Sequence, residues 1–212
     1  MYNKHMKKIT EPSYSEELES MSINDIDDYR YDDKCYKDEE INDNHVQTEF
    51  YECEFSNITI HTIMRSCLFV DVIFDHCDLS NANFEESVFR RCIFKNCRMT
   101  GIDLSACSFT DVKLIHCQCT LVNLNATKWN RTEWDSCMFV DGSLHSVQLK
   151  DVNVVDCDFS RCEIHQTSLS GIDLSTSNIN GIAVLPENLK GVIVNQEQAI
   201  VLAGLLGIVI KG

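Results

Sequence analysis

Cysteine is the potentially reactive residue type that this sequence places most regularly. Five of its twelve cysteines recur at every twentieth position: Cys77, Cys97, Cys117, Cys137 and Cys157. A column of thiols could bind a metal ion or take part in redox chemistry. The sequence has no Cys-x-x-Cys pair, however, which is the usual spacing in a zinc site. We therefore interpret the column as small apolar packing, a role that free cysteine fills well.

Signatures of catalysis are missing from the sequence. It contains no Gly-rich phosphate-binding loop, no His-Glu-x-x-His pair and no Gly-x-Ser-x-Gly turn. The sequence therefore predicts a protein that is not an enzyme and that holds no cofactor or metal ion.

Net charge is the strongest property of the composition. There are 33 acidic residues against 18 basic ones, which gives −15 at neutral pH. Such a surface favours basic partners and argues against direct binding of nucleic acid, although solubility alone is the plainer explanation. A basic cluster of Arg90, Arg91, Lys95 and Arg98 is the local exception, and we interpret it as a solvated face.

The charge is unevenly distributed along the chain. Residues 65–131, the proximal segment, hold seven acidic and eight basic residues, a net charge of +1. Residues 133–187, the distal segment, hold nine acidic and two basic residues, a net charge of −7. A partner that recognises acidic surface should therefore prefer the distal segment.

A period of five positions organises the chain. From Phe69 to Val194, every fifth position is apolar, and a smaller residue lies two positions before most of these. This period fits neither a helix nor a flat strand. It requires short extended pieces separated by turns, each with two residues pointing inward. Because one unit cannot bury its own apolar residue, the units must stack into a solenoid.

A second, longer period indicates four units per coil. One outward column recurs at every twentieth position and alternates in sign: Asp71, Arg91, Asp111, Arg131 and Asp151. Stacked neighbours of opposite charge are favourable, so this alternation is expected only if residues four units apart lie above one another.

The units CDLSN (77–81), ANFEE (82–86), IDLSA (102–106), CDFSR (157–161) and IDLST (172–176) carry the motif A(D/N)LXX. In this the chain resembles the pentapeptide repeat family. The resemblance implies an all-β fold, a right-handed quadrilateral β-helix in which each unit forms one side of a square.

The ends of the chain depart from the repeat. Residues 1–45 predict an acidic, partly disordered arm, and residues 46–194 the β-helix, with an irregular first coil at 46–64 where the phase shifts by one position. Residues 195–212 predict a cap: Asn195 as helix N-cap, a short helix over 199–205 and a strand from Gly207. An exposed apolar terminus of this kind favours a partner.

The tail LKGVIVNQEQA…LLGIVIKG resembles that of the Qnr-type quinolone-resistance subgroup. That resemblance implies a homodimer joined through the C-terminus, and a non-enzymatic, DNA-mimicking protein that binds DNA gyrase and topoisomerase IV and protects them from quinolones. The expected dimer interface comprises Leu202, Leu205, Leu206, Ile208, Val209 and Ile210. Some members of that family have loops that project from the rod, but residues 67–194 contain no insertion here. A rod without such loops would have to act through its faces, its acidic middle or its N-terminal arm.

Six distal acidic residues fall at outward positions and are the candidate partner-binding surface: Asp141, Asp151, Asp156, Asp158, Glu163 and Asp173. The alternative is a scaffolding solenoid with another basic protein partner, because a fold does not fix a function. No apolar run is long enough to span a membrane, and no signal peptide precedes the twelve cysteines, so we expect a cytoplasmic protein with free thiols.

Overall fold

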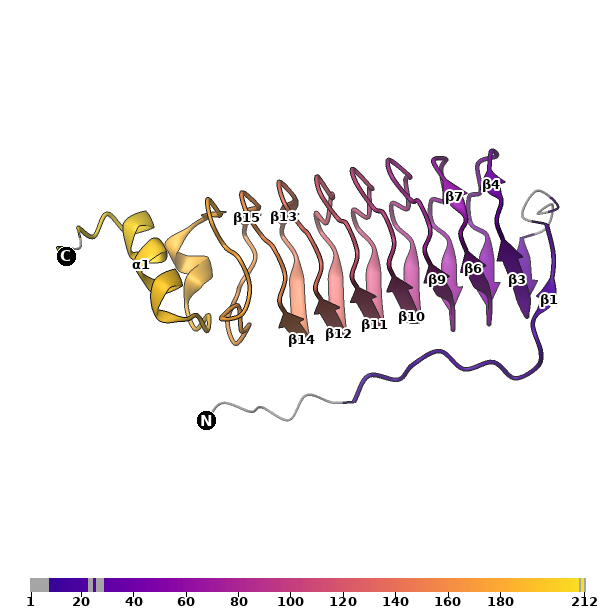
Figure 1. Cartoon of the computed structure of the whole chain (residues 1–212), viewed down its shortest axis with the longest axis horizontal. Coiled ribbons are helices and arrows are strands. Elements are labelled where there is room, and N and C mark those ends of the chain that lie inside the picture. Colours follow the sequence, from indigo (N-terminus) through magenta and orange to yellow (C-terminus); the bar gives the residue numbers. More distant parts are fainter. Residues whose placement is uncertain (1–7, 23–24, 26–28, 210, 212) are drawn as a thin grey trace.

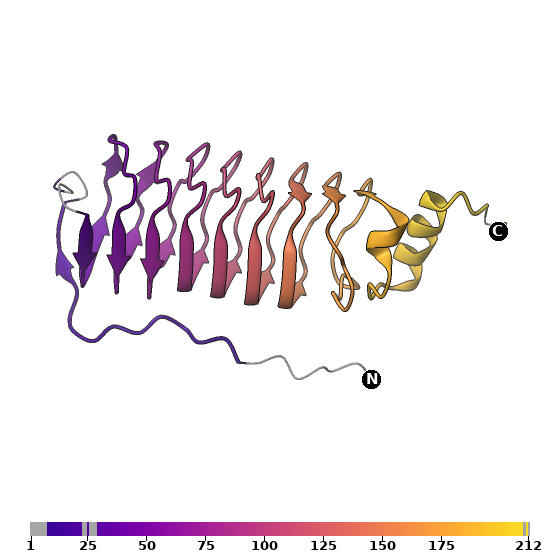
Figure 2. The same ribbon diagram turned by 180° about the vertical axis from the view of Figure 1, so that it is seen from behind.

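The chain winds into one long solenoid with an extended arm beside it and a helix at the C-terminal end (Figures 1 and 2). The structure is a computed structural model, and it describes residues 8–22, 25, 29–209 and 211. Within those residues, no helix has the length and hydropathy needed to cross a lipid bilayer.

The strands run parallel and stack coil upon coil. In chain order they are β1 (Glu19–Ser20), β2 (Arg30–Asp32), β3 (Lys34–Lys37), β4 (Glu40–Ile41), β5 (Glu49–Tyr51), β6 (Glu54–Ser56), β7 (Thr59–Ile60), β8 (Leu68–Val70), β9 (Ile73–Asp75), β10 (Val88–Lys95), β11 (Ser108–Ile115), β12 (Lys128–Asp135), β13 (Ser143–His145), β14 (Gln148–Val155), β15 (Glu163–His165) and β16 (Ala183–Val184). Phe89 of β10 pairs with Phe109 of β11, which pairs with Trp129 of β12. Each partner lies four units along the chain from the last, so this register confirms four units per coil and the predicted β-helix.

The four sides of the solenoid are named here by the central residues of their units. Side A holds Phe69, Phe89, Phe109, Trp129 and Leu149, and side B holds Phe74, Phe94, Leu114, Trp134 and Val154. Side C holds Leu79, Met99, Cys119, Phe139 and Phe159, and side D holds Phe84, Leu104, Leu124, Leu144 and Ile164. The longest strands run across sides A and B, whereas side C pairs through single bridges such as Asp78 to Arg98.

The corners of the square need a left-handed backbone. His76 has φ 54° and Asn81 has φ 59°, and the same conformation recurs at the end of most units. Asn, Asp and His tolerate it better than other side chains, whereas Arg and Leu rarely adopt it. Arg91 (φ 51°) and Leu121 (φ 60°) are nevertheless held there, so the stacked coils impose the turn on them.

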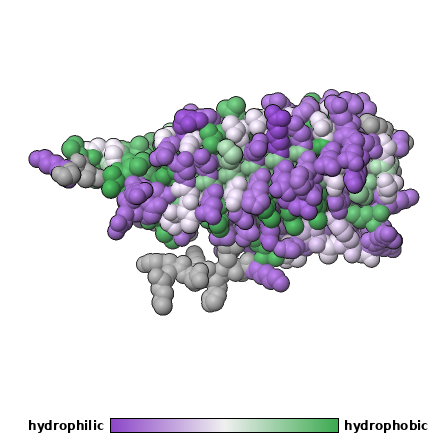
Figure 3. All heavy atoms as spheres, viewed as in Figure 1, coloured by the Kyte–Doolittle hydropathy of each residue, from purple (hydrophilic) through white to green (hydrophobic). Residues whose placement is uncertain are grey.

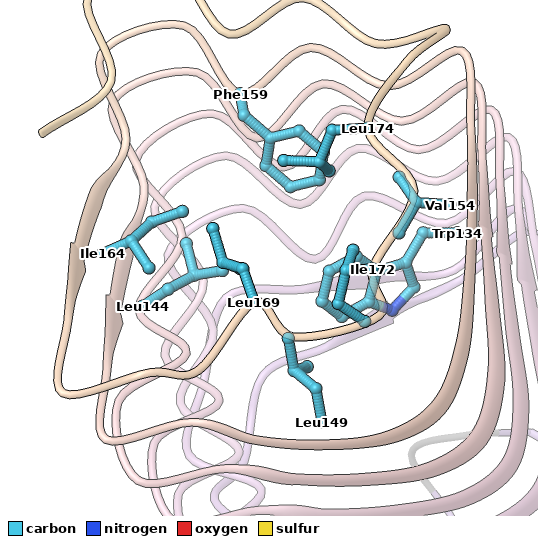
Figure 4. Close-up of a pocket in the computed structure, with 9 residues that line it drawn as sticks. All are labelled: Trp134, Leu144, Leu149, Val154, Phe159, Ile164, Leu169, Ile172 and Leu174. Carbon is cyan, nitrogen blue, oxygen red and sulfur yellow. The ribbon is translucent and has the colours of Figure 1, made fainter. Parts of the chain in front are cut away.

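The core changes in character along the rod. In the proximal coils the rings of Phe89 and Phe109 stack with centroids 5.0 Å apart, and the ring centroids of Phe109 and Trp129 are 3.8 Å apart. In the distal coils the same positions are mostly aliphatic. They surround a void of about 10 Å³ that is lined by Trp134, Leu144, Leu149, Val154, Phe159, Ile164, Leu169, Ile172 and Leu174 (Figure 4). Because this void is apolar and holds at most one water, we interpret it as loose packing and not as a ligand site.

The solenoid begins earlier than the predicted residue 46. Strand β2 pairs with β5, β3 with β6 and β4 with β7, so coils already stack from Arg30. The inward residue Tyr31 pairs with Phe50, and Phe50 pairs with Phe69, so both steps are one position shorter than in the later coils. Each of the first two coils therefore has one side that lacks a residue, which explains the phase shift seen in the sequence.

The C-terminal end is closed by the helix α1 (Gln196–Leu205). Asn195 is its N-cap, as predicted, and forms a reciprocal capping box with Gln198. The Gln198 amide also donates to the carbonyl of Ser177 (2.6 Å), which has no further coil to pair with, and to that of Leu174 (2.8 Å), which also accepts from the Ser177 amide. The cap thus satisfies a backbone carbonyl that the open end would leave unpaired.

Two details of this end differ from the prediction. A short 3₁₀ helix, η2 (Pro186–Leu189), forms there, with Glu187 exposed at the position where most units have their smaller inward residue and Asn188 buried instead. The strand expected from Gly207 is not formed at Ile208 or Val209, and Ile210 lies outside the described residues. An extended segment needs a neighbouring strand, and none lies beyond the last coil in the described part of the chain.

Candidate protein-binding surface

The six predicted acidic residues lie around the rod and not on one face. Asp151 is at the corner of sides A and B, Asp156 at the corner of B and C, Asp158 on side C, Asp141 at the corner of C and D, Glu163 on side D and Asp173 on side B. One flat partner surface cannot contact all of them at once.

Side B of the distal segment concentrates negative charge. Its outward positions carry Glu133, Asp135, Asp156 and Asp173, and Asp151 stands at its leading corner. Across the units 132–136, 152–156 and 172–176 no lysine or arginine interrupts them. We call these five residues the acidic face. The sequence analysis missed Glu133 and Asp135, although the register of four units per coil would have aligned them with the others.

Three of the predicted residues are already engaged within the chain. Both carboxylate oxygens of Asp141 accept hydrogen bonds from Arg161, each 2.7 Å long, and this contact lowers the pKa of Asp141. Asp158 accepts from the Ser160 backbone amide at 2.8 Å and Asp173 from the Ser175 backbone amide at 2.9 Å, so each supports a turn. Asp141 is the least available of the three to a partner, because its ion pair occupies both oxygens.

In the proximal segment, most charged residues form ion pairs between neighbouring coils. Its acidic residues pair with basic ones in the next coil: Asp71–Arg91 (2.5 Å), Asp75–Lys95 (3.1 Å), Asp78–Arg98 (3.5 Å), Arg65–Glu85 (3.5 Å) and Asp111–Arg131 (2.5 Å). Three of the four residues in the basic cluster take part in these pairs. The cluster is therefore largely neutralised, which weakens any interpretation of it as a nucleic-acid site.

The cysteines pack as the sequence predicted. All twelve are free, and only Cys35 is more than marginally exposed. Burial raises the pKa of Cys92 and of Cys162 to about 12, so both thiols stay protonated at neutral pH. Among the residues that the structure describes, no group of three or more His, Cys, Asp or Glu side chains could hold a metal ion.

Apolar residues are exposed at the C-terminal end, over α1 and the residues that follow it (Figure 3). Four of the predicted interface residues are exposed: Leu205, Leu206, Ile208 and Val209, the last at 86%. Leu202 is only 8% exposed and packs into the core of its own chain, so it is less available to a second copy than predicted. Ile200 and Val201 are exposed instead and extend the same surface.

Comparison with known families matches the repeat. The family model described as Pentapeptide repeat region matches residues 67–137, and the one described as Pentapeptide repeats (8 copies) matches residues 143–181. No curated protein matches the chain.

Solved structures share the fold at low identity. HetL, a pentapeptide repeat protein involved in heterocyst differentiation regulation in the cyanobacterium Nostoc sp. strain PCC 7120, is 12% identical, with a TM-score of 0.37 over 79% of this chain and 90% of its own. Full-length QnrB1, a plasmid-mediated fluoroquinolone resistance protein, is 17% identical, with a TM-score of 0.34 over 84% of this chain and all of its own. These likenesses concern the fold alone.

Proposed function

The chain belongs to the pentapeptide repeat proteins, and on that premise we propose that it is a non-enzymatic binding protein whose acidic face engages a basic, DNA-binding surface of another protein. The observation that carries this proposal is that Glu133, Asp135, Asp156 and Asp173 lie in units of distal side B that contain no lysine or arginine. Asp151, at the corner, follows Lys150 and stands one coil above Arg131, so its charge is partly offset. Ordered carboxylates on a straight rod present regularly spaced negative charge. Complementary charge of this kind speeds association and selects basic partners.

The specific partner that we propose is a type II topoisomerase, DNA gyrase or topoisomerase IV, with protection from quinolones as the outcome. Support comes from the resemblance of the C-terminal tail to the Qnr-type subgroup and from the acidic face. Since the repeats carry no inserted loop between residues 67 and 194, the faces of the rod themselves would have to make the contact.

We also propose that two copies join through the C-terminal apolar surface, which comprises Ile200, Val201, Leu205, Leu206, Ile208 and Val209. The helix already uses its Gln198 and Leu202 side to close the solenoid, so this opposite surface remains free for a second copy. Such a dimer would bring two acidic distal segments close to the middle of a longer rod. Light scattering should then give twice the 24.2 kDa chain mass.

The decisive experiment is a gyrase supercoiling assay with and without ciprofloxacin, together with binding measurements. The test variant is Asp151→Asn, Asp156→Asn and Asp173→Asn. Asn tolerates the left-handed corners at residues 151 and 156 and keeps the acceptor oxygen of residue 173 for the Ser175 amide. We expect about tenfold weaker binding, from roughly 0.5 kcal/mol for each exposed charge.

A matched control removes three carboxylates from the proximal segment: Asp75→Asn, Asp78→Asn and Glu85→Gln. It changes the net charge equally but frees bases that were paired. Equal binding by both triple variants would refute the acidic face. If the parent protein neither binds gyrase nor protects it, the scaffolding function with another basic partner is the better explanation.

A further inference from the structure

The N-terminal arm, residues 8–22, lies along the rod between its N-terminal end and the middle coils (Figures 1 and 2). Its backbone amides donate to carboxylates of one corner column, that between sides A and B. Thr10 donates to Asp111 (3.3 Å) and Ser13 to Asp71 (3.4 Å). Ser15 donates to Glu52, the residue one coil below Asp71. The arm therefore runs against the direction in which the solenoid grows.

The spacing of these contacts fits an extended peptide. Three extended residues, from Thr10 to Ser13, cover about 10 Å, and two coils at about 4.8 Å each cover nearly the same length. Asp71 and Asp111 lie two coils apart because Arg91 occupies the position between them, and Arg131 occupies the position above Asp111. Each arginine holds one acceptor with two hydrogen bonds, Arg91 to Asp71 and Arg131 to Asp111.

The arm covers the carboxylates of this corner and lowers their exposure to solvent. The Asp71 and Asp111 side chains are each 9% exposed. Asp141 makes the same two-bonded contact with an arginine at a corner that the arm does not reach, and it is 37% exposed. Ile9 is buried as well, so the arm is seated by an apolar contact in addition to its amides.

The arm is nevertheless an imperfect occupant. Within the described part of the chain, one carboxylate oxygen of Asp33 and the hydroxyl of Tyr14 are buried without a hydrogen-bond partner. Asp33 is the next member of the same corner column, one coil below Glu52. Burial is the main cause that raises the pKa of Asp33, and the nearby carboxylates of Glu52 and of the arm residue Glu16 raise it further.

Strand β1 fixes the C-terminal part of the arm, because the Glu19 amide donates to the Asp33 carbonyl (2.8 Å) and the Met21 amide to the Cys35 carbonyl (3.1 Å). Two ion pairs also oppose the repulsion at Asp33. Glu11 of the arm pairs with Lys113, and Glu19 pairs with Lys34. Both glutamates are largely exposed, so each pair contributes little, as is usual for surface ion pairs.

We propose that this corner is a docking track for an extended peptide segment of a partner protein. The stretch of the arm before β1, residues 8–18, is an internal occupant of this track, whereas β1 itself stays paired with β3. The amides that the track recognises are common to every peptide, whereas its end at Asp33 and Glu52 requires a basic side chain where the arm has Glu16. Main-chain contacts supply affinity and this one position supplies selectivity. The track lies on the proximal coils, so it is separate from the acidic face and does not depend on a topoisomerase partner.

The test uses the full-length protein and three labelled peptides that correspond to residues 8–18, the part of the arm that precedes β1. One has the natural sequence, one carries Glu16→Lys and one, as a matched control of equal charge, carries Glu17→Lys. We expect the Glu16→Lys peptide to bind about fivefold tighter than the Glu17→Lys peptide, as a close charge contact at the surface would produce. Its binding should also speed hydrogen exchange at the Thr10 and Ser13 amides of the protein, because the arm is displaced.

A second pair of variants tests the arm in place. Glu16→Lys in the full chain should slow exchange at Thr10 and Ser13 by a similar factor, whereas Glu17→Lys should not. The proposal is overturned if these two amides exchange in the parent protein as fast as in the free peptide, because the arm is then not docked. It is equally overturned if both lysine peptides bind alike, or if the Glu16→Lys peptide binds without changing exchange at the arm.

Discussion

The proximal and distal segments share the same backbone fold but differ in the residues of their core and in the pairing of their surface charges. Between residues 65 and 131 the core is aromatic and most surface carboxylates pair with a base one coil away. Between residues 133 and 187 the core is mainly aliphatic, and Asp141–Arg161 is the one ion pair formed there within the described residues. The comparison indicates that the β-helix is set by the inward residues and corners, which leaves the outward columns free to specialise.

The largest expected difference between the segments lies in the core. Phe109→Ala should lower the free energy of unfolding by about 3–5 kcal/mol, because the ring is stacked on both sides. Leu169→Ala, beside the distal void, should cost about 2–3 kcal/mol. Urea unfolding followed by tryptophan fluorescence measures both. An equal loss at the two sites would mean that the aromatic column adds nothing to the stability of the proximal coils.

Local opening should follow the same asymmetry. Burial raises the pKa of Cys92 and Cys162 alike to about 12, so alkylation at pH 8 requires the surrounding coil to open. We expect Cys162 to be labelled about tenfold faster than Cys92, which corresponds to about 1.4 kcal/mol less protection. Peptide-resolved mass spectrometry after timed alkylation reads out each thiol. Faster labelling at Cys92 would contradict a weaker distal segment.

Two chemically similar corners provide a finer comparison. Asp111→Asn should cost about 1 kcal/mol, since it weakens a covered contact with Arg131 and the amide bond from Thr10. Asp141→Asn, at the uncovered corner, should leave the urea midpoint unchanged within error. If the two substitutions have equal effects, coverage by the arm does not strengthen the contact.

The smallest effect is the pH dependence of that contact. The hydrogen bond from Arg131 is the main cause that lowers the pKa of Asp111 in the folded chain below its ordinary value of 3.8. Its contribution to stability is therefore complete above about pH 4 and is lost as the pH falls through the folded pKa. The stability difference between the parent and Asp111→Asn should shrink between pH 5 and pH 3. A difference that persists at pH 3 would point to packing and not charge.

The sequence predicted the fold because the pattern that specifies it is strictly local. Each unit places its own inward pair, and the alternating charges of one outward column specify the number of units per coil. Asn195, the N-cap of the helix at the C-terminal end, was predictable for the same reason, since capping depends on neighbouring residues.

Contacts between segments that are distant in the chain were harder to predict from the sequence. The first coils were hidden because Tyr31, Tyr36 and Ile41 lie among dense charges and their coil is one position short. Docking of the arm on Asp71 and Asp111 joins residues 58 and 101 positions apart, and no periodicity predicts such a contact. The acidic residues were found, but their distribution over four sides became clear only once the register was known.

The closed square also restricts how such a chain can change length during evolution. A duplicated block of four units adds one complete coil and about 4.8 Å of rod, and every outward column keeps its direction. A block of one or two units turns all later columns toward another side, so a partner surface such as the acidic face would rotate away from its target. A side that lacks one residue can still pair with a complete one: the shortened side that ends at Met64 stacks on the shortened side that ends at His45 and also on the full side that ends at Phe84. Insertion or deletion of units can thus turn a binding surface toward another side of the rod while every residue in that surface stays the same.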